Sequence, residues 1–153
     1  MNRRVAFAVV LAVQFAAAAD NQPLTGTWRL EQQEINGSAT KTEPLTLKIS
    51  QAGDKVAFAF SVPVNDVYFV SMSYTLRLDG SEADVKNAQG ETVGHIQMST
   101  AGTAQYKFFL KGPNRPDSTG KLTVSPDGKT LISETDAVQG GRSIHTKQTF
   151  SRY

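Results

Sequence analysis

Apolar and polar residues alternate with a period of two along most of the chain. One run places Val56, Phe58, Phe60, Val62 and Val64 on the same face. A second run does so with Tyr68, Val70, Met72, Tyr74, Leu76 and Leu78, and a third with Tyr106, Phe108 and Leu110. Successive side chains of a strand point to opposite sides of a sheet. Each run therefore predicts a strand with one apolar and one polar face.

Clusters of turn-forming residues separate these runs at regular intervals. They are Ala52–Asp54, Asp79–Ser81, Gln89–Glu91, Pro126–Gly128 and Gln139–Gly141. Gly, Asp and Asn tolerate the positive φ of tight hairpin turns, so short connections between antiparallel strands are expected. The positions of these turn clusters predict strands at about 25–34, 45–51, 55–64, 67–78, 82–87, 92–99, 103–111, 119–125, 130–137 and 143–152.

The strand pattern predicts an all-β fold: a single antiparallel up-and-down β-barrel of about eight to ten strands. Residues 20–153 show no segment with a helical period. Short connections disfavour a parallel sheet with crossovers, and closure into a barrel removes exposed sheet edges. A sandwich is the alternative. The longest irregular loop is expected over Pro113–Ser118, at one mouth of the barrel.

The first residues have the pattern of an export signal. Arg3 and Arg4 precede an apolar run from Val5 to Phe15, and Ala17–Ala19 form a small-residue cleavage site. The apolar run is shorter than the roughly 20 residues that a membrane-spanning helix needs. We therefore expect residues 1–19 to be a signal peptide and residues 20–153 to be one exported domain, periplasmic or extracellular.

Charge and cysteine content narrow the classes of partner and chemistry. Without Arg3 and Arg4, the basic and acidic residues balance at 14 each, which disfavours nucleic acid as a partner. The chain has no cysteine. Disulfides, zinc–thiolate sites, iron–sulfur clusters and a thiol nucleophile are thereby excluded, so the domain must be held by its core and its sheet hydrogen bonds.

The runs Leu24–Leu30 and Lys121–Leu131, one toward each end of the domain, resemble those of small exported bacterial lipocalin-like proteins, which are calycin-type barrels. The run Leu24–Leu30 contains Gly26 and Trp28 in the Gly-x-Trp arrangement that opens the first lipocalin strand. The run Lys121–Leu131 is similar to one near the C-terminus of the exported proteins. The resemblance implies that Trp28 lies at the closed end of the barrel and that Arg152, from the last strand, packs across it. It implies a fold rather than an activity.

The sequence offers no catalytic or metal-binding constellation. Ser143 and His145 share a strand face, but spacing alone does not assemble an oriented triad with an acid. His95 and His145, with Glu91 or Glu134, could ligate a metal only if their strands were neighbours. We therefore expect no catalytic residues, metal or cofactor, although an enzyme is not ruled out by these arguments.

The apolar strand faces provide the remaining candidate site. Seven of their residues, mostly aromatic, would line the barrel interior: Phe58, Phe60, Tyr68, Met72, Tyr74, Tyr106 and Phe108. A barrel of this size either fills its interior with side chains or holds one small ligand. The sequence thus predicts an exported, non-enzymatic protein that binds a small apolar or amphipathic ligand. The alternative is a filled barrel that acts through its loops on a protein partner.

Overall fold

The computed structural model describes residues 22–153, which form eleven β-strands. Their bounds are β1 Gly26–Ile35, β2 Ser38–Thr40, β3 Thr46–Ala52, β4 Lys55–Val64, β5 Val67–Arg77, β6 Asp79–Asn87, β7 Thr92–Gly102, β8 Gln105–Gly112, β9 Arg115–Val124, β10 Thr130–Gln139 and β11 Arg142–Arg152. The expected signal peptide, residues 1–19, lies outside the described residues. Residues 22–153 contain no helical segment with the length and apolar character that crossing a bilayer would require.

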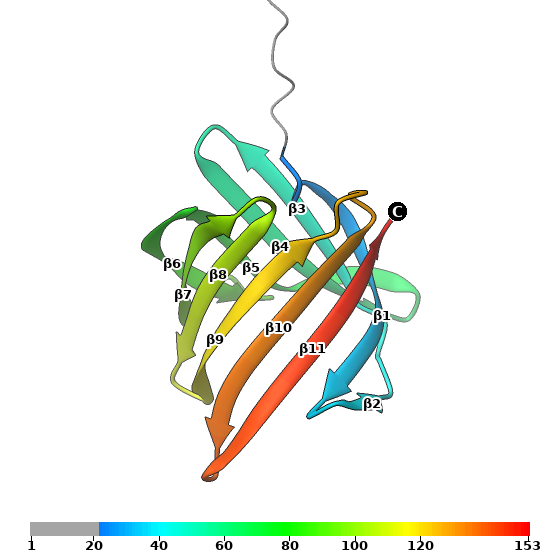
Figure 1. Cartoon of the computed structure of the whole chain (residues 1–153), viewed down its shortest axis with the longest axis vertical. Helices are drawn as coiled ribbons and strands as arrows, with labels where there is room; N and C mark the ends of the chain where they lie inside the picture. Colours follow the sequence, from blue (N-terminus) through cyan, green and yellow to red (C-terminus); the bar gives the residue numbers. More distant parts are fainter. Residues whose placement is uncertain (1–21) are drawn as a thin grey trace, which may run out of the picture.

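Ten of the strands form one closed antiparallel barrel. Each strand from β3 to β11 pairs with the next, β1 pairs with β3, and the additional pairing of β1 with β11 closes the circle (Figure 1). Strand β2 folds back onto the end of β1, where Ile35 is paired with Ser38. The predicted all-β, up-and-down barrel is confirmed.

The structure corrects the loop expected over Pro113–Ser118. Gly112 pairs with Arg115, so Pro113 and Asn114 alone reverse the chain and β9 begins at Arg115. Pairing of β9 with β10 begins only at Ser118. Pro116, which lacks an N–H, therefore lies where β9 is a rim strand with one partner, a position that proline tolerates.

One end of the barrel is closed by Trp28 and Arg152. The two residues are paired across β1 and β11, and Trp28 is fully buried. The guanidinium of Arg152 lies over the indole, 4.2 Å from the ring centroid to Cζ. The indole N–H of Trp28 donates a hydrogen bond of 2.9 Å to the carbonyl of Leu24. These contacts join the first strand to the last, where the sheet closes.

A β-bulge changes the direction of side chains in the β4–β5 hairpin. Phe60 is paired with Met72 but Ser61 with Val70, so Ser71 is an extra residue in β5. One extra residue reverses the inward and outward alternation beyond it. The hairpin tip also extends past its neighbours, because β3 pairs with β4 only as far as Ser61 and β6 pairs with β5 only at Met72 and Ser73.

Candidate functional site

The barrel contains a cavity of about 540 Å³ that reaches Leu47 and Phe150 inside and opens near Arg115 and Pro116, away from Trp28. It is lined by Leu45, Leu47, Phe58, Phe60, Ser71, Met72, Tyr74, Ile96, Phe108, Leu110, Arg115, Pro116, Ser118, Leu122, Ser133, Thr135, Ala137, Thr146, Gln148 and Phe150. The interior is thus partly hollow, whereas the sequence left a barrel filled with side chains as the other possibility. Its volume falls within the range of about 300–1,000 Å³ that is usual for small-molecule sites.

The cavity has one apolar wall and one wall rich in hydroxyl groups. Strands β3, β4, β5 and β8 contribute Leu47, Phe58, Phe60, Met72, Tyr74 and Phe108 to the apolar wall. Strands β9, β10 and β11 contribute Ser118, Ser133, Thr135, Thr146 and Gln148 to the polar one. The amide of Gln148 donates a hydrogen bond of 2.9 Å to Oε1 of Gln33. This bond holds the Gln148 side chain against the wall.

The polar wall arises from the same period of two that forms the core. In β10 the inward series continues from fully buried Leu131 to Ser133, Thr135 and Ala137. In β11 it passes from buried Phe150 to Gln148 and Thr146. In both strands a large apolar side chain lies nearest the closed end and is followed by polar ones. In β10 the series then ends with the small apolar residue Ala137 toward the open end.

Tyr74 lies in the apolar wall and is 8% exposed. Its ring stacks on Phe58, with centroids 4.8 Å apart and an interplanar angle of 25°, and lies 6.0 Å from the centroid of Phe60. Burial raises the pKa of the Tyr74 phenol above its ordinary value, because the phenolate would lose its hydration. The group is therefore a neutral hydroxyl, able to donate a hydrogen bond, at any physiological pH.

Ser118 is the buried polar side chain of the cavity wall, 7% exposed. Among the described residues, the hydroxyls of Ser118 and Tyr74 make no side-chain hydrogen bond to protein. Both hydroxyls keep some contact with solvent. Buried hydroxyl groups usually have a partner. Both residues line the cavity, so a molecule bound there can supply such a partner.

Phe108 lines the cavity and also packs against Gly120 in the barrel wall. Its ring lies against Gly120 of β9, with which it is paired. A Cβ at Gly120 would overlap both the Phe108 ring and the carbonyl oxygen of Glu134. Phe108 lines the interior cavity and also a groove on the outer face of β7–β11. The absence of a side chain at Gly120 therefore allows the ring to fill this part of the barrel wall.

Five of the seven expected interior residues line the cavity. They are Phe58, Phe60, Met72, Tyr74 and Phe108. Tyr106 is 6% exposed and belongs to the core, but it does not contact the cavity. The expectation for Tyr68 is wrong: this residue is 55% exposed, because it lies beyond the β-bulge at Ser71 on the projecting hairpin.

The sequence did not indicate the polar wall of the cavity. Ser133, Thr135 and Thr146 lie in hydrophilic runs and resemble solvent-facing positions. Their spacing from Leu131 and Phe150 could have identified them. These two residues are buried, so every second residue from them along β10 and β11 also points inward. Arg115 was missed for a different reason, because it fell inside the expected loop.

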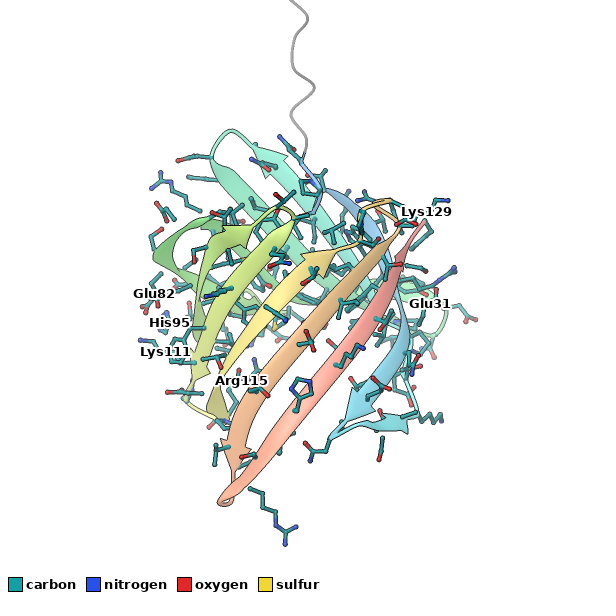
Figure 2. All side chains as sticks on the ribbon, in the orientation of Figure 1. Glu31, Glu82, His95, Lys111, Arg115 and Lys129 are labelled. Carbon is teal, nitrogen blue, oxygen red and sulfur yellow. The ribbon has the colours of Figure 1, made fainter. Side chains whose placement is uncertain are left out.

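The two histidines are far from each other in the sheet order and lie outside the cavity. His95 of β7 lies 3.1 Å from Asp84, from Nδ1 to Oδ1, while Lys111 lies 3.0 Å from Glu82, from Nζ to Oε2 (Figure 2). On β11, Nδ1 of His145 lies 2.7 Å from Oδ1 of Asp136. Strands β7 and β11 are not neighbours, so the structure does not bring the histidines together.

Neither histidine cluster has the form of a catalytic or metal site within residues 22–153. No group of three or more His, Cys, Asp or Glu side chains in this range is arranged to hold a metal ion. The hydrogen bonds of the His145 ring do not include Ser143. The two clusters are partly exposed contacts of histidine and lysine side chains with carboxylates, and surface contacts of this kind generally contribute little to stability.

The comparisons show a likeness of structure without a matching sequence family. No family model matches the chain, and no curated protein matches it in sequence. The ileal bile acid-binding protein of zebrafish, solved in complex with cholic acid, superposes with a TM-score of 0.60. The likeness covers 86% of this chain and 99% of that one, at 17% sequence identity. The two proteins share the fold of a closed antiparallel β-barrel. At this identity the likeness carries the fold and nothing more.

Proposed function

We propose that the protein is an exported binding protein that holds a small, mainly apolar molecule in its barrel and does not transform it. The observation that carries this proposal is the cavity of about 540 Å³, lined by Phe58, Phe60, Met72, Tyr74 and Phe108. Removing a ligand's apolar surface from water would supply the main driving force for binding. The preformed barrel would keep the conformational cost of binding low.

The two walls favour an amphipathic ligand over a purely apolar one. Ser133, Thr135 and Thr146 face the aromatic wall across the cavity. Tyr74 and Ser118, which are largely buried residues, add two more hydroxyl groups to the lining of the cavity. A ligand with oxygen atoms along one side would satisfy these groups, whereas a plain hydrocarbon would leave them unbonded. The cholic acid complex of the structurally similar zebrafish protein supports a small-molecule ligand.

Export is a separate part of the proposal. It rests on Arg3, Arg4, the apolar run to Phe15 and the small residues Ala17–Ala19. The domain described by the structure is cysteine-free, so it would not depend on disulfide formation after export. The mass of the protein recovered outside the cytoplasm tests this part, because removal of residues 1–19 leaves a chain that begins at Asp20.

Native mass spectrometry on protein purified gently from its own host tests the binding. We expect an additional mass that disappears on denaturation. Thr135→Phe should abolish it by filling the cavity, whereas Thr119→Phe should not, because Thr119 is exposed on the outer face of β9. A bare mass, together with no thermal shift from a panel of lipids and aromatic compounds, would exclude a small-molecule carrier.

A surface patch supports a protein-binding function as the second candidate. At the tip of the β4–β5 hairpin, Val64, Val67, Tyr68, Phe69 and Val70 are each between 45% and 55% exposed. Contiguous exposed apolar residues often mark an interaction surface. If this function is correct, the double substitution Tyr68→Ser, Phe69→Ser should remove a partner recovered by cross-linking, while Thr135→Phe should leave it bound.

A further inference from the structure

Arg115 is the only charged residue among those that line the cavity. It is the first residue of β9, directly after the Gly112–Arg115 turn, and its side chain also borders a smaller pocket beside Met72, Val85 and Val93. Figure 2 shows it at the end of the barrel away from Lys129, which lies beside the closed end. Arg115 is exposed, and it therefore stands at the mouth of the cavity.

Gly112 leaves room for the Arg115 stem at this turn. A Cβ at Gly112 would lie 3.3 Å from Cγ of Arg115 and 2.8 Å from the carbonyl oxygen of Val93. A larger residue would press on the arginine side chain and on the backbone of β7. The side chain is therefore seated against its own turn, with its stem beside the mouth of the cavity.

The positive charge of Arg115 is not neutralised by a neighbouring carboxylate in the described part of the chain. The ion pairs of residues 22–153 involve other basic residues: Arg29, Lys41, Arg77, Lys86, His95, Lys111, Lys121 and His145. The side-chain hydrogen bonds in this range also leave Arg115 out. Its guanidinium is available to an anion from outside the protein.

Polarity falls along β9 from this mouth toward the closed end. Arg115 is followed by Pro116 and then by Ser118, a largely buried residue that lines the cavity. Leu122 continues the same lining deeper in the barrel. The strand thus presents a cation, a hydroxyl and an apolar side chain in this order. The sequence of groups matches a molecule with a charged head, a polar neck and an apolar body.

We propose that Arg115 binds the acidic head group of the ligand, so that the barrel selects anionic amphiphiles such as carboxylates or sulfonates. This inference rests on the proposed function, because the apolar body of the ligand must occupy the cavity. Guanidinium groups recognise carboxylate and sulfonate oxygens through paired, charge-assisted hydrogen bonds. The head group stays at the mouth, where it keeps part of its hydration, and the desolvation cost remains small.

Two fluorescent probes of nearly the same shape test the inference. The anionic probe is 8-anilinonaphthalene-1-sulfonate, and the neutral one is N-phenyl-1-naphthylamine, which lacks the sulfonate. Titrations use the wild-type protein, Arg115→Gln and Arg142→Gln. Arg142 is the matched control, because it is exposed at the same end of the barrel, on the β10–β11 hairpin, but does not line the cavity. Thermal unfolding checks that each variant is folded.

We expect Arg115→Gln to weaken binding of the sulfonate about tenfold, the size of one partly exposed charge-assisted contact. Arg142→Gln should change it less than twofold, and neither variant should alter binding of the neutral probe. Two outcomes would overturn the assignment of Arg115 while leaving the binding cavity in place. In the first, Arg115→Gln and Arg142→Gln weaken binding of the sulfonate equally. In the second, Arg115→Gln weakens binding of both probes equally. If wild-type protein binds neither probe in the cavity, as judged by Thr135→Phe, the proposed function itself fails and the head-group site with it.

Discussion

Arg152 joins three segments of the chain while its guanidinium covers the indole of Trp28. Its Nε donates to the carbonyl of Gly128 at 2.7 Å, Nη2 donates to Pro23 at 2.8 Å, and Nη1 donates to Thr25. The same group lies 4.2 Å from the Trp28 ring centroid. Because the carbonyls belong to the N-terminal segment and to the β9–β10 turn, a single side chain connects both to β11 at the point of closure.

Arg152→Gln should lower the free energy of unfolding by roughly 1–3 kcal/mol, because it removes the cation–π contact and the hydrogen bonds to the three carbonyls. Urea unfolding followed by Trp28 fluorescence measures the change, with Arg142→Gln as a surface control that should remain within about 0.5 kcal/mol of wild type. Similar stabilities for the two variants would show that the Arg152 contacts do not hold the barrel closed.

Gly26→Ala should perturb the same closure without changing a charge. Gly26 has φ of 149°, a backbone conformation that favours glycine, and a Cβ there would overlap Nη1 of Arg152. We expect a loss of roughly 1–3 kcal/mol in the free energy of unfolding, from backbone strain and displacement of the guanidinium. In the Arg152→Gln background the loss should be smaller, because part of the overlap is gone. Strict additivity in this double-mutant cycle would argue against the contact.

Gly120→Ala should destabilise the barrel wall beside the cavity. The added methyl would overlap the ring of Phe108 and the backbone carbonyl of Glu134. Overpacking of this kind typically costs about 1–3 kcal/mol, and we expect urea unfolding to show a loss of that size in the free energy of unfolding. Phe108→Leu should relieve part of the cost of Gly120→Ala. If Gly120→Ala is as stable as wild type, then the Phe108 ring is not held in the position described.

The alternation of apolar residues was sufficient to predict the barrel, and the reason is geometric. Val56, Phe58, Tyr74 and Leu76 are all buried, as their period of two requires. The same reasoning failed at Tyr68, because the extra residue at Ser71 is set by pairing with β4 and leaves no mark in the β5 sequence. A bulge depends on the partner strand, so a period read from one strand cannot reveal it.

The candidate site was predictable on its apolar wall and not on its polar wall. Phe58 and Phe60 are identifiable because burial of aromatic residues is the default. Ser133 and Thr135 are not, because a hydroxyl that faces an internal cavity has the same sequence pattern as one that faces solvent. Arg115 became recognisable only when the Gly112–Arg115 pairing placed it at the mouth of the cavity.

Two buried tyrosines provide a matched test of the cavity. Tyr74 lines it, whereas Tyr106, which is equally buried, does not. Tyr74→Phe should therefore weaken binding of an oxygen-bearing ligand by about 0.5–1.5 kcal/mol, the net value of one hydrogen bond. Tyr106→Phe should leave affinity unchanged. Isothermal titration calorimetry with the ligand found by native mass spectrometry measures both, and equal affinities for the two variants would remove the Tyr74 hydroxyl from the binding site.

Burial of Tyr74 also predicts how stability depends on alkaline pH. The folded-state pKa of its phenol is raised by burial, while the unfolded chain releases this proton near pH 10. Below pH 10 both states are protonated and the group has no effect on the pH dependence. As the pH rises above 10, only the unfolded state loses the proton. Deprotonation of Tyr74 therefore favours unfolding, and the stability of the folded state falls.

Tyr74→Phe removes this effect and isolates it from other groups that titrate at high pH. We expect the stability of wild type relative to Tyr74→Phe to fall by up to about 1.4 kcal/mol per pH unit above pH 10, and to be constant at lower pH. Urea unfolding between about pH 8 and pH 11 measures the difference. Tyr68→Phe is the control for loss of a phenol at an exposed position, because Tyr68 is 55% exposed. A constant difference across the whole range would mean that the Tyr74 phenol ionises as readily in the folded barrel as in the unfolded chain, and would contradict the raised pKa.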